Sequence, residues 1–178
     1  QFDGSNFYNK AKRLFPKGRL TYFDYRGLAT FLSKNNDCEI TYYVGEVRRD
    51  PRDKKSCELY ANQQSLFLNL RKQKVATKLG YLLKSKGVFH EKGVDVHIAV
   101  DMTVGAVKDN FDKVFVISSD TDLIPAVEIS KEEKKKIVYV GFENFLSRAM
   151  SKSCSSFISI KKKDLETFYL KTPPKIKK

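Results

Sequence analysis

The sequence has few of the residues that build disulfide frameworks, zinc sites or membrane spans. Its three cysteines, Cys38, Cys57 and Cys154, are odd in number and far apart, which argues against both a disulfide framework and a zinc site. No apolar run reaches the roughly 18 residues needed to cross a bilayer, and no basic segment followed by an apolar one indicates a signal peptide. These absences favour a cytoplasmic protein with reduced thiols and no membrane association.

Acidic residues are also scarce relative to basic ones. The chain has 34 lysines and arginines against 21 aspartates and glutamates, which gives a net charge of +13 and a pI near 9.6. Such a charge indicates an anionic partner, of which nucleic acid is the commonest. A membrane surface, an acidic protein partner or a merely solvated lysine-rich surface would also account for it.

The 178 residues suffice for one domain with one sizeable core, and 41% of them are hydrophobic, as in ordinary globular proteins. We find no internal repeat or linker, and we expect a single domain over residues 1–170 followed by a basic, frayed tail at 171–178. The chain begins with Gln1 in a pattern typical of a strand end, so we expect further residues upstream.

Apolar runs rich in β-branched residues alternate with segments of helical periodicity. The expected strands are 1–3, 39–47, 74–85 (whose leucines also suit a helix), 113–118 and 135–142. The expected helices are 6–15, 24–35, 57–73, 94–110, 122–133, 144–153 and 164–170. Residues 47–56 and 87–93 read as loops. The alternation predicts a three-layer α/β/α sandwich with about five mostly parallel strands.

Four aspartates stand at the ends of predicted elements. Asp3 follows the first strand, Asp95 begins a long helix, Asp120 follows the strand at 113–118, and Asp122 begins the next helix. Each has an ordinary explanation alone, because Asp95 and Asp122 suit helix N-caps and Asp3 suits a turn. Because the carboxyl ends of parallel strands share one sheet edge, however, the acids should form a patch there. Carboxylates without nearby cysteine or histidine suit Mg²⁺ or Mn²⁺.

Three motifs in this order, "FDGSNFY", "EKGVDVHIAVDM" and "VFVISSDTDLIPAVE", followed by "KKIVYVGF", resemble the NYN domain. The resemblance is to its LabA-like branch in the PIN-like nuclease superfamily and covers the chain from Phe2 to Ile160. It implies a Rossmann-like fold with about five parallel strands and a metal-dependent ribonuclease that acts on RNA. A homodimer is compatible with this type of domain, and the residues themselves do not decide it.

The resemblance also assigns roles to individual residues. Asp3, Asp95, Asp120 and Asp122 would be the catalytic residues and the ligands of Mg²⁺ or Mn²⁺, with Asp122 either a ligand or a residue that orients water. The supporting residues would be Asn6, Ser118 or Ser119, and Asp101. Asp101 lies six residues and about 240° around the helix from Asp95, so we expect it to act behind the site or structurally.

Two positions depart from the family pattern. Ser119 stands where the family usually has glycine, and the acid that the family often has near Ser155 is absent. The alternative function is therefore a weakly active or inactive NYN module that binds RNA or a protein partner. A phosphatase with a strand-end nucleophile would need a second acid after Asp3, and "DGSN" does not supply one.

The basic run "RRDPRDKK" follows a predicted strand. We expect Arg48, Arg49 and Arg52 to contact RNA phosphates, and an exposed charged loop without a partner is the alternative. His90 and His97 are the only histidines, and we assign neither of them to a metal.

Overall fold

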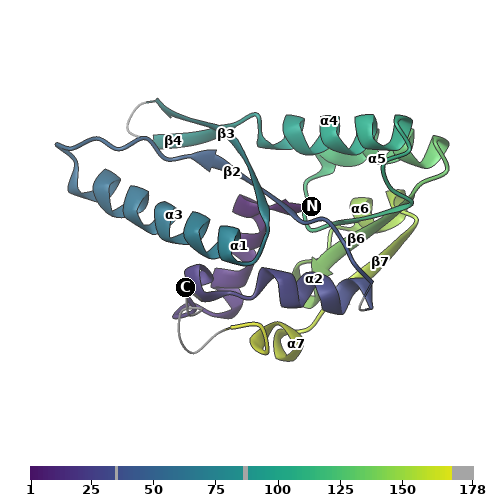
Figure 1. Cartoon of the computed structure of the whole chain (residues 1–178), viewed down its shortest axis with the longest axis horizontal. Coiled ribbons are helices and arrows are strands. Elements are labelled where there is room, and N and C mark those ends of the chain that lie inside the picture. The colour runs from purple at the N-terminus through teal and green to yellow at the C-terminus, as the bar shows by residue number, and fades with distance from the viewer. Residues whose placement is uncertain (35, 86–87, 170–178) are drawn as a thin grey trace.

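The computed structural model describes residues 1–34, 36–85 and 88–169, in which strands and helices alternate as predicted (Figure 1). The predicted tail at 171–178 lies outside these residues. The strands are β1 (Phe2–Asp3), β2 (Thr41–Glu46), β3 (Ala76–Ser85), β4 (Val88–Lys92), β5 (Lys113–Val116), β6 (Lys136–Phe142) and β7 (Ser156–Ile160). The helices are α1 (Gly4–Leu14), α2 (Tyr25–Ser33), α3 (Lys54–Lys72), α4 (Val94–Val107), α5 (Ile124–Glu132), α6 (Arg148–Ser153) and α7 (Lys162–Glu166), with short 3-10 helices η1 (Leu20–Tyr22), η2 (Thr121–Leu123) and η3 (Glu143–Phe145).

The short strand β1 joins the two halves of the sheet. Phe2 pairs with Tyr42 on β2 and forms a parallel bridge to Ile117, just after β5. The backbone N–H of Asp3 donates to the carbonyl of Ile117 at 3.3 Å. The strand order is therefore β4-β3-β2-β1-β5-β6-β7, and all neighbours are parallel except β3 and β4.

Helices cover both faces of the sheet, and each face has its own core. Because successive side chains of a strand point to opposite faces, Tyr42 joins the core shared with α1, α2, α3 and α7, whereas Tyr43 joins the core shared with α4, α5 and α6. Figure 1 shows α4 and α5 above the sheet, with α2, α3 and α7 below it. The predicted three-layer α/β/α sandwich is confirmed.

Two strands were not predicted. The segment 87–93, predicted as a loop, contains β4, which forms an antiparallel hairpin with β3; β7 lies beside β6. Both are only five residues long, so pairing with a neighbouring strand determines their conformation more than their own hydrophobic pattern does. The predicted loop 47–56 was also too long, since α3 begins at Lys54.

The helix at α4 was predicted, but its pattern did not reveal which face packs on the core. The sequence shows apolar residues at helical spacing from Val96 to Val107, yet the side chains buried against the sheet are Val94, Ile98, Met102 and Ala106. Both faces of this helix are apolar, so periodicity could not distinguish them. Among the helices of the described residues, none has both the length and the apolar character to cross a membrane.

Candidate active site

The candidate site lies where the order of the strands reverses. From β1 the chain builds β2 and β3 on one side of the sheet, and it returns through α4 to place β5 on the other side. In parallel sheets such a reversal opens a crevice at the carboxyl ends of the two strands. Asp3 ends β1 and Asp120 follows β5, so the topology places both acids at this edge of the sheet, as predicted.

Asp3 is the most firmly held of the four aspartates. It is 4% exposed, its Oδ1 accepts a hydrogen bond from the backbone N–H of Asn6 at 3.0 Å, and its Oδ2 accepts one from the hydroxyl of Ser118 at 2.6 Å. The first of these bonds caps α1. Burial raises the pKa of Asp3, and Glu91 and Asp120 raise it further, although both hydrogen bonds oppose that shift. Its carboxylate is therefore held by two hydrogen bonds and lies near two other carboxylates.

Asp120 is the residue just before η2, on the turn that follows β5, and Asp122 lies within η2. The backbone N–H of Asp120 donates to the hydroxyl of Ser118 at 3.1 Å, so Ser118 links Asp3 to Asp120. Oδ1 of Asp120 in turn accepts from the backbone N–H of Asp122 at 3.0 Å and caps η2. Asp122 is exposed to solvent. Ser118 therefore lies between the two aspartates, and its supporting role at the site stays a prediction.

Asp95 lies close enough to the other three aspartates to interact with their charges. It lies in the first turn of α4, which begins after Gly93, whose φ of 82° is one that glycine adopts without strain. Burial raises the pKa of Asp95 from 3.8 to about 6, and the negative charges of Asp3, Asp120 and Asp122 add to the shift. The four predicted aspartates therefore lie close enough to repel one another.

Asn6 and Ser119 bridge α1 to the end of β5. The side-chain oxygen of Asn6 accepts from the backbone N–H of Ser119 at 3.3 Å, and its amide nitrogen donates to the Ser119 hydroxyl at 3.3 Å. The Ser119 hydroxyl also accepts a hydrogen bond from the ammonium of Lys10. The serine that replaces the usual glycine is thus held by two residues of α1.

Lys10 was missed in the sequence. Burial lowers its pKa to about 8, with Asp3 acting in the opposite direction and Arg13 reinforcing the shift. The available signal was spacing, because Asp3, Asn6 and Lys10 are three and four residues apart and so share one face of a helix. Lys10 places a positive charge beside the acidic cluster.

Glu91 was also missed, because its segment was predicted as a loop. It lies on β4, and its carboxylate accepts hydrogen bonds from the backbone N–H of Gly45 at 2.6 Å and from the hydroxyl of Ser5 at 2.9 Å. Its charge raises the pKa of Asp3. Glu91 therefore adds a fifth carboxylate to the edge of the site.

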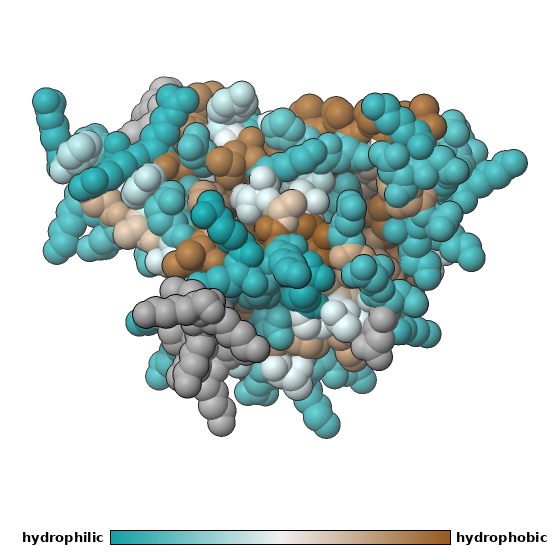
Figure 2. Space-filling view, viewed as in Figure 1, coloured by the Kyte–Doolittle hydropathy of each residue, from teal (hydrophilic) through white to brown (hydrophobic). Residues whose placement is uncertain are grey.

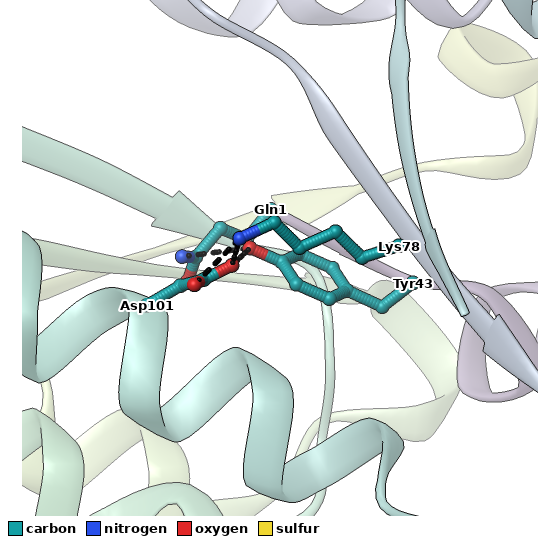
Figure 3. A network of polar contacts seen from close by, with 4 residues as sticks. All are labelled: Gln1, Tyr43, Lys78 and Asp101. Atoms are coloured by element: carbon teal, nitrogen blue, oxygen red, sulfur yellow. Dashed lines mark hydrogen bonds and ion pairs between the residues drawn. The ribbon is translucent and has the colours of Figure 1, made fainter. Parts of the chain in front are cut away.

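Asp101 lies in a different network, drawn in Figure 3. Its carboxylate accepts a hydrogen bond from the Tyr43 hydroxyl at 2.8 Å and pairs with the ammonium of Lys78 at 2.6 Å. The amide of Gln1 donates to the same Tyr43 hydroxyl at 3.3 Å. Burial raises the pKa of Tyr43, and the hydrogen bond to Asp101 raises it further. Asp101 thus fastens α4 to β2 and β3.

The three candidate arginines, Arg48, Arg49 and Arg52, are exposed on the loop between β2 and α3. Figure 1 shows this loop at one end of the long axis of the molecule. It follows the carboxyl end of β2, as expected. A role in contacting phosphates stays a prediction.

The donors at the site suit a hard divalent cation in their chemistry. They are carboxylate, amide and hydroxyl oxygens, which Mg²⁺ and Mn²⁺ prefer. Within residues 1–34, 36–85 and 88–169, no three histidine, cysteine, aspartate or glutamate side chains are placed to hold one ion together. The repulsion that raises the pKa of Asp95 is what such a cation would relieve. The donor types therefore fit a metal, and the side chains would have to converge on it.

Asp95→Asn is expected to stabilise the metal-free protein at neutral pH. The pKa of Asp95 is about 6 in the folded protein and 3.8 ordinarily, so the folded state binds more protons between about pH 4 and 6 and loses stability as the pH rises through that window. Because Asp95 is partly exposed and solvent screens its charge, we expect a gain of about 1 kcal/mol at pH 7. Urea unfolding in EDTA would measure it, and an equal gain at pH 4.5 would contradict the repulsion.

Comparisons with known proteins agree with the fold and the motifs. The uncharacterized protein MJ0482 of Methanocaldococcus jannaschii is 34% identical over 67 residues, which are 38% of this chain and only 28% of that protein. The crystal structure of VPA0982 from Vibrio parahaemolyticus, a protein of unknown function, has a similar fold, with a TM-score of 0.66, 22% identity and 89% of each chain covered. The sequence model of the NYN domain matches residues 2–161. Because that match spans most of the 178 residues, the chain belongs to the NYN domain family of PIN-like nucleases.

Proposed function

We propose that this NYN domain is a ribonuclease that hydrolyses phosphodiester bonds with Mg²⁺ or Mn²⁺ held by its aspartates. The observation that carries the proposal is the meeting of Asp3, Asp95, Asp120 and Asp122 at the reversal of strand order, where their charges act on one another. A folded protein gains no stability from such repulsion, so the cluster is best explained by a bound cation.

Asp3, Asp120 and Asp95 would hold the ion, and Asp122 would hold it or orient a water molecule. A divalent ion bound there lowers the pKa of a coordinated water and neutralises charge on the phosphate. Ser118 fixes the Asp3 carboxylate through its hydroxyl, and the capping bond from Asn6 fixes the other oxygen. These contacts orient a carboxylate before substrate binds, which is how a site limits reorganisation during reaction.

The basic residues of α1 would receive the RNA strand. Lys10 and Arg13 lie three residues apart on α1, the helix that Asp3 caps, and the Arg13 guanidinium lies 5.5 Å from the centre of the Phe145 ring. Lys10 is held by Ser119 at the cluster, and Arg13 lies farther along the helix. Phosphates bound by these two residues would bring the neighbouring phosphodiester to the acids, and the net charge of +13 would attract the strand.

A second candidate function is RNA binding without cleavage. Two observations favour it. In the described part of the chain, no three histidine, cysteine, aspartate or glutamate side chains are placed to hold one ion, and the Ser119 side chain bonds Asn6 and Lys10 where the family usually has glycine. The two functions share the RNA surface and differ only in the chemistry at the aspartates.

Incubation of end-labelled single-stranded RNA with the protein in Mn²⁺ or in EDTA distinguishes the two functions. We expect cleavage with Mn²⁺ and none with EDTA; RNA that is bound in both and cut in neither would favour the binding module.

Affinity for RNA in EDTA should fall with salt concentration. In Lys10→Met we expect the log–log salt slope to shrink by about 0.7, the amount for one phosphate contact on a single strand, while Lys10→Arg keeps it. An unchanged slope in Lys10→Met would remove Lys10 from the RNA surface.

A further inference from the structure

The outer face of α4 is an exposed apolar stripe, formed by Val96, Val100, Val104 and Val107. Their exposed fractions are 64%, 52%, 42% and 61%. At 100° per residue the four side chains fall within an arc of about 80°, opposite the buried Ile98 and Gly105. Figure 2 shows hydrophobic surface along the upper edge of the molecule, where Figure 1 places α4.

The stripe is not needed by the core of this chain. Val94, Ile98 and Met102 belong to the core on the sheet side of α4, and Ala106 is also buried. A helix that is apolar all round is normally covered on all sides, so the valine stripe is expected to be covered by something outside the described fold. Ile129 is also exposed, on α5, which packs beside α4.

The charge of the stripe indicates what can cover it. Lysine and arginine make up 34 of the 178 residues, but none lies in α4. A nucleic acid would find no cation on this helix, and the helix's Asp101 is neutralised by Lys78. Two copies of a chain of net charge +13 repel each other over most of their surfaces. They repel less along α4, which has no lysine or arginine from Val94 to Val107 and is followed by Lys108 at one end.

The spacing of the valines is nearly palindromic, with steps of four, four and three residues. Suppose that two copies of α4 meet antiparallel around a two-fold axis that crosses the outer face of the helix at the height of Met102. Val100 then faces the partner's Val104, and Val96 faces the partner's Val107. Ala99 and Thr103 border the stripe with small side chains that allow a close approach, and His97 and Lys108 lie on its other border. An isologous interface requires this kind of self-complementary surface.

We propose that the valine stripe of α4 is a self-association face on which a second copy of this chain packs its own α4 antiparallel around a two-fold axis. The inference does not depend on the proposed ribonuclease activity. The 14-residue helix is about 21 Å long, so the helix pair alone covers about 200 Å² on each copy. Standard interfaces bury roughly 800 Å² per partner. We therefore expect a weak dimer that uses adjoining surface as well, with a Kd on the order of 10 µM.

Sedimentation velocity of the nuclease-treated, RNA-free protein from 1 to 200 µM would test the proposal. We expect a reversible monomer–dimer equilibrium that strengthens with added salt, because salt screens the repulsion between the two positively charged copies. Association through RNA would weaken with salt. A protein that is monomeric up to 200 µM in both low and high salt would overturn the proposal and leave the stripe to another segment or partner.

Paired charge substitutions test the predicted register. V100K should raise the Kd at least tenfold, and V100K/V104K should abolish the dimer. V100K/V104E should restore it, because each introduced ammonium then faces one introduced carboxylate of the partner, which gives two such pairs in the interface. L68K on α3, a substitution at another exposed apolar residue (50% exposed), should leave the Kd unchanged. Failure of V100K/V104E to restore the dimer, or an equal effect of L68K, would contradict antiparallel pairing through α4; thermal unfolding of each variant verifies that it is folded.

Discussion

Asp120→Asn is expected to slow metal-dependent RNA cleavage about 100-fold or more. Asp120 follows β5 and lies close enough to Asp3 and Asp95 to raise the pKa of both. Loss of its negative charge removes a proposed metal ligand, and a divalent ion supplies several kcal/mol of transition-state stabilisation in such sites. Single-turnover cleavage of end-labelled RNA in saturating Mn²⁺ measures the chemical step directly.

The substitution should leave the fold intact. Oδ1 of Asp120 caps η2 by accepting from the backbone N–H of Asp122, and asparagine is an equally good cap. Asp112→Asn, at an exposed position just before β5, is the matched control and should cleave at the wild-type rate. If Asp120→Asn retains that rate, the reaction centre lies elsewhere, whereas loss of activity together with a lower melting temperature would mean that Asp120 acts through stability.

The position of the site could be predicted from the sequence because it depends on the order of the elements. Asp3 and Asp120 each follow an apolar strand, and parallel strands bring such residues to one edge. Ser118 could be expected beside them for the same reason. The hydrogen bond that links Ser118 to Asp3 joins residues 115 positions apart, and only the pairing of β1 with the end of β5 brings them together.

The positions of residues on short or weakly patterned elements could not be predicted from the sequence. Glu91 reaches the site because β4 turns back along β3, and a short segment with glycine at either end gave no strand signal. The orientation of α4 was hidden for another reason, since its two faces are nearly equally apolar and the core accepts Ile98 and Met102 in place of the valines. Hydrophobic periodicity shows that a helix has an apolar face. When both faces are apolar, it does not show which of them packs on the core.

Phe7→Ala is expected to cost about 3–5 kcal/mol of the free energy of unfolding, a typical loss for a buried phenylalanine. The Phe7 side chain is fully buried. Its ring centre lies 5.2 Å from that of Phe23, 5.5 Å from Phe2 and 5.7 Å from Phe142. These rings come from the segment before α2 and from β1 and β6, so Phe7 fastens α1 to the middle of the sheet. Urea unfolding should show a lower midpoint with an unchanged slope, and the melting temperature should fall by about 10 °C.

Tyr8→Ala is the matched control for Phe7→Ala, because the neighbouring side chain is 48% exposed and should cost less than about 1 kcal/mol. A similar cost for both would mean that the aromatic cluster does not anchor α1. The anchoring also determines the site, because Phe7 lies between Asn6 and Lys10 on the helix that Asp3 caps. Of these residues, Asn6 and Lys10 both bond Ser119. A loosened α1 would move Asn6 and Lys10 together, so even well below its melting temperature Phe7→Ala should bind RNA more weakly, whereas Tyr8→Ala should not.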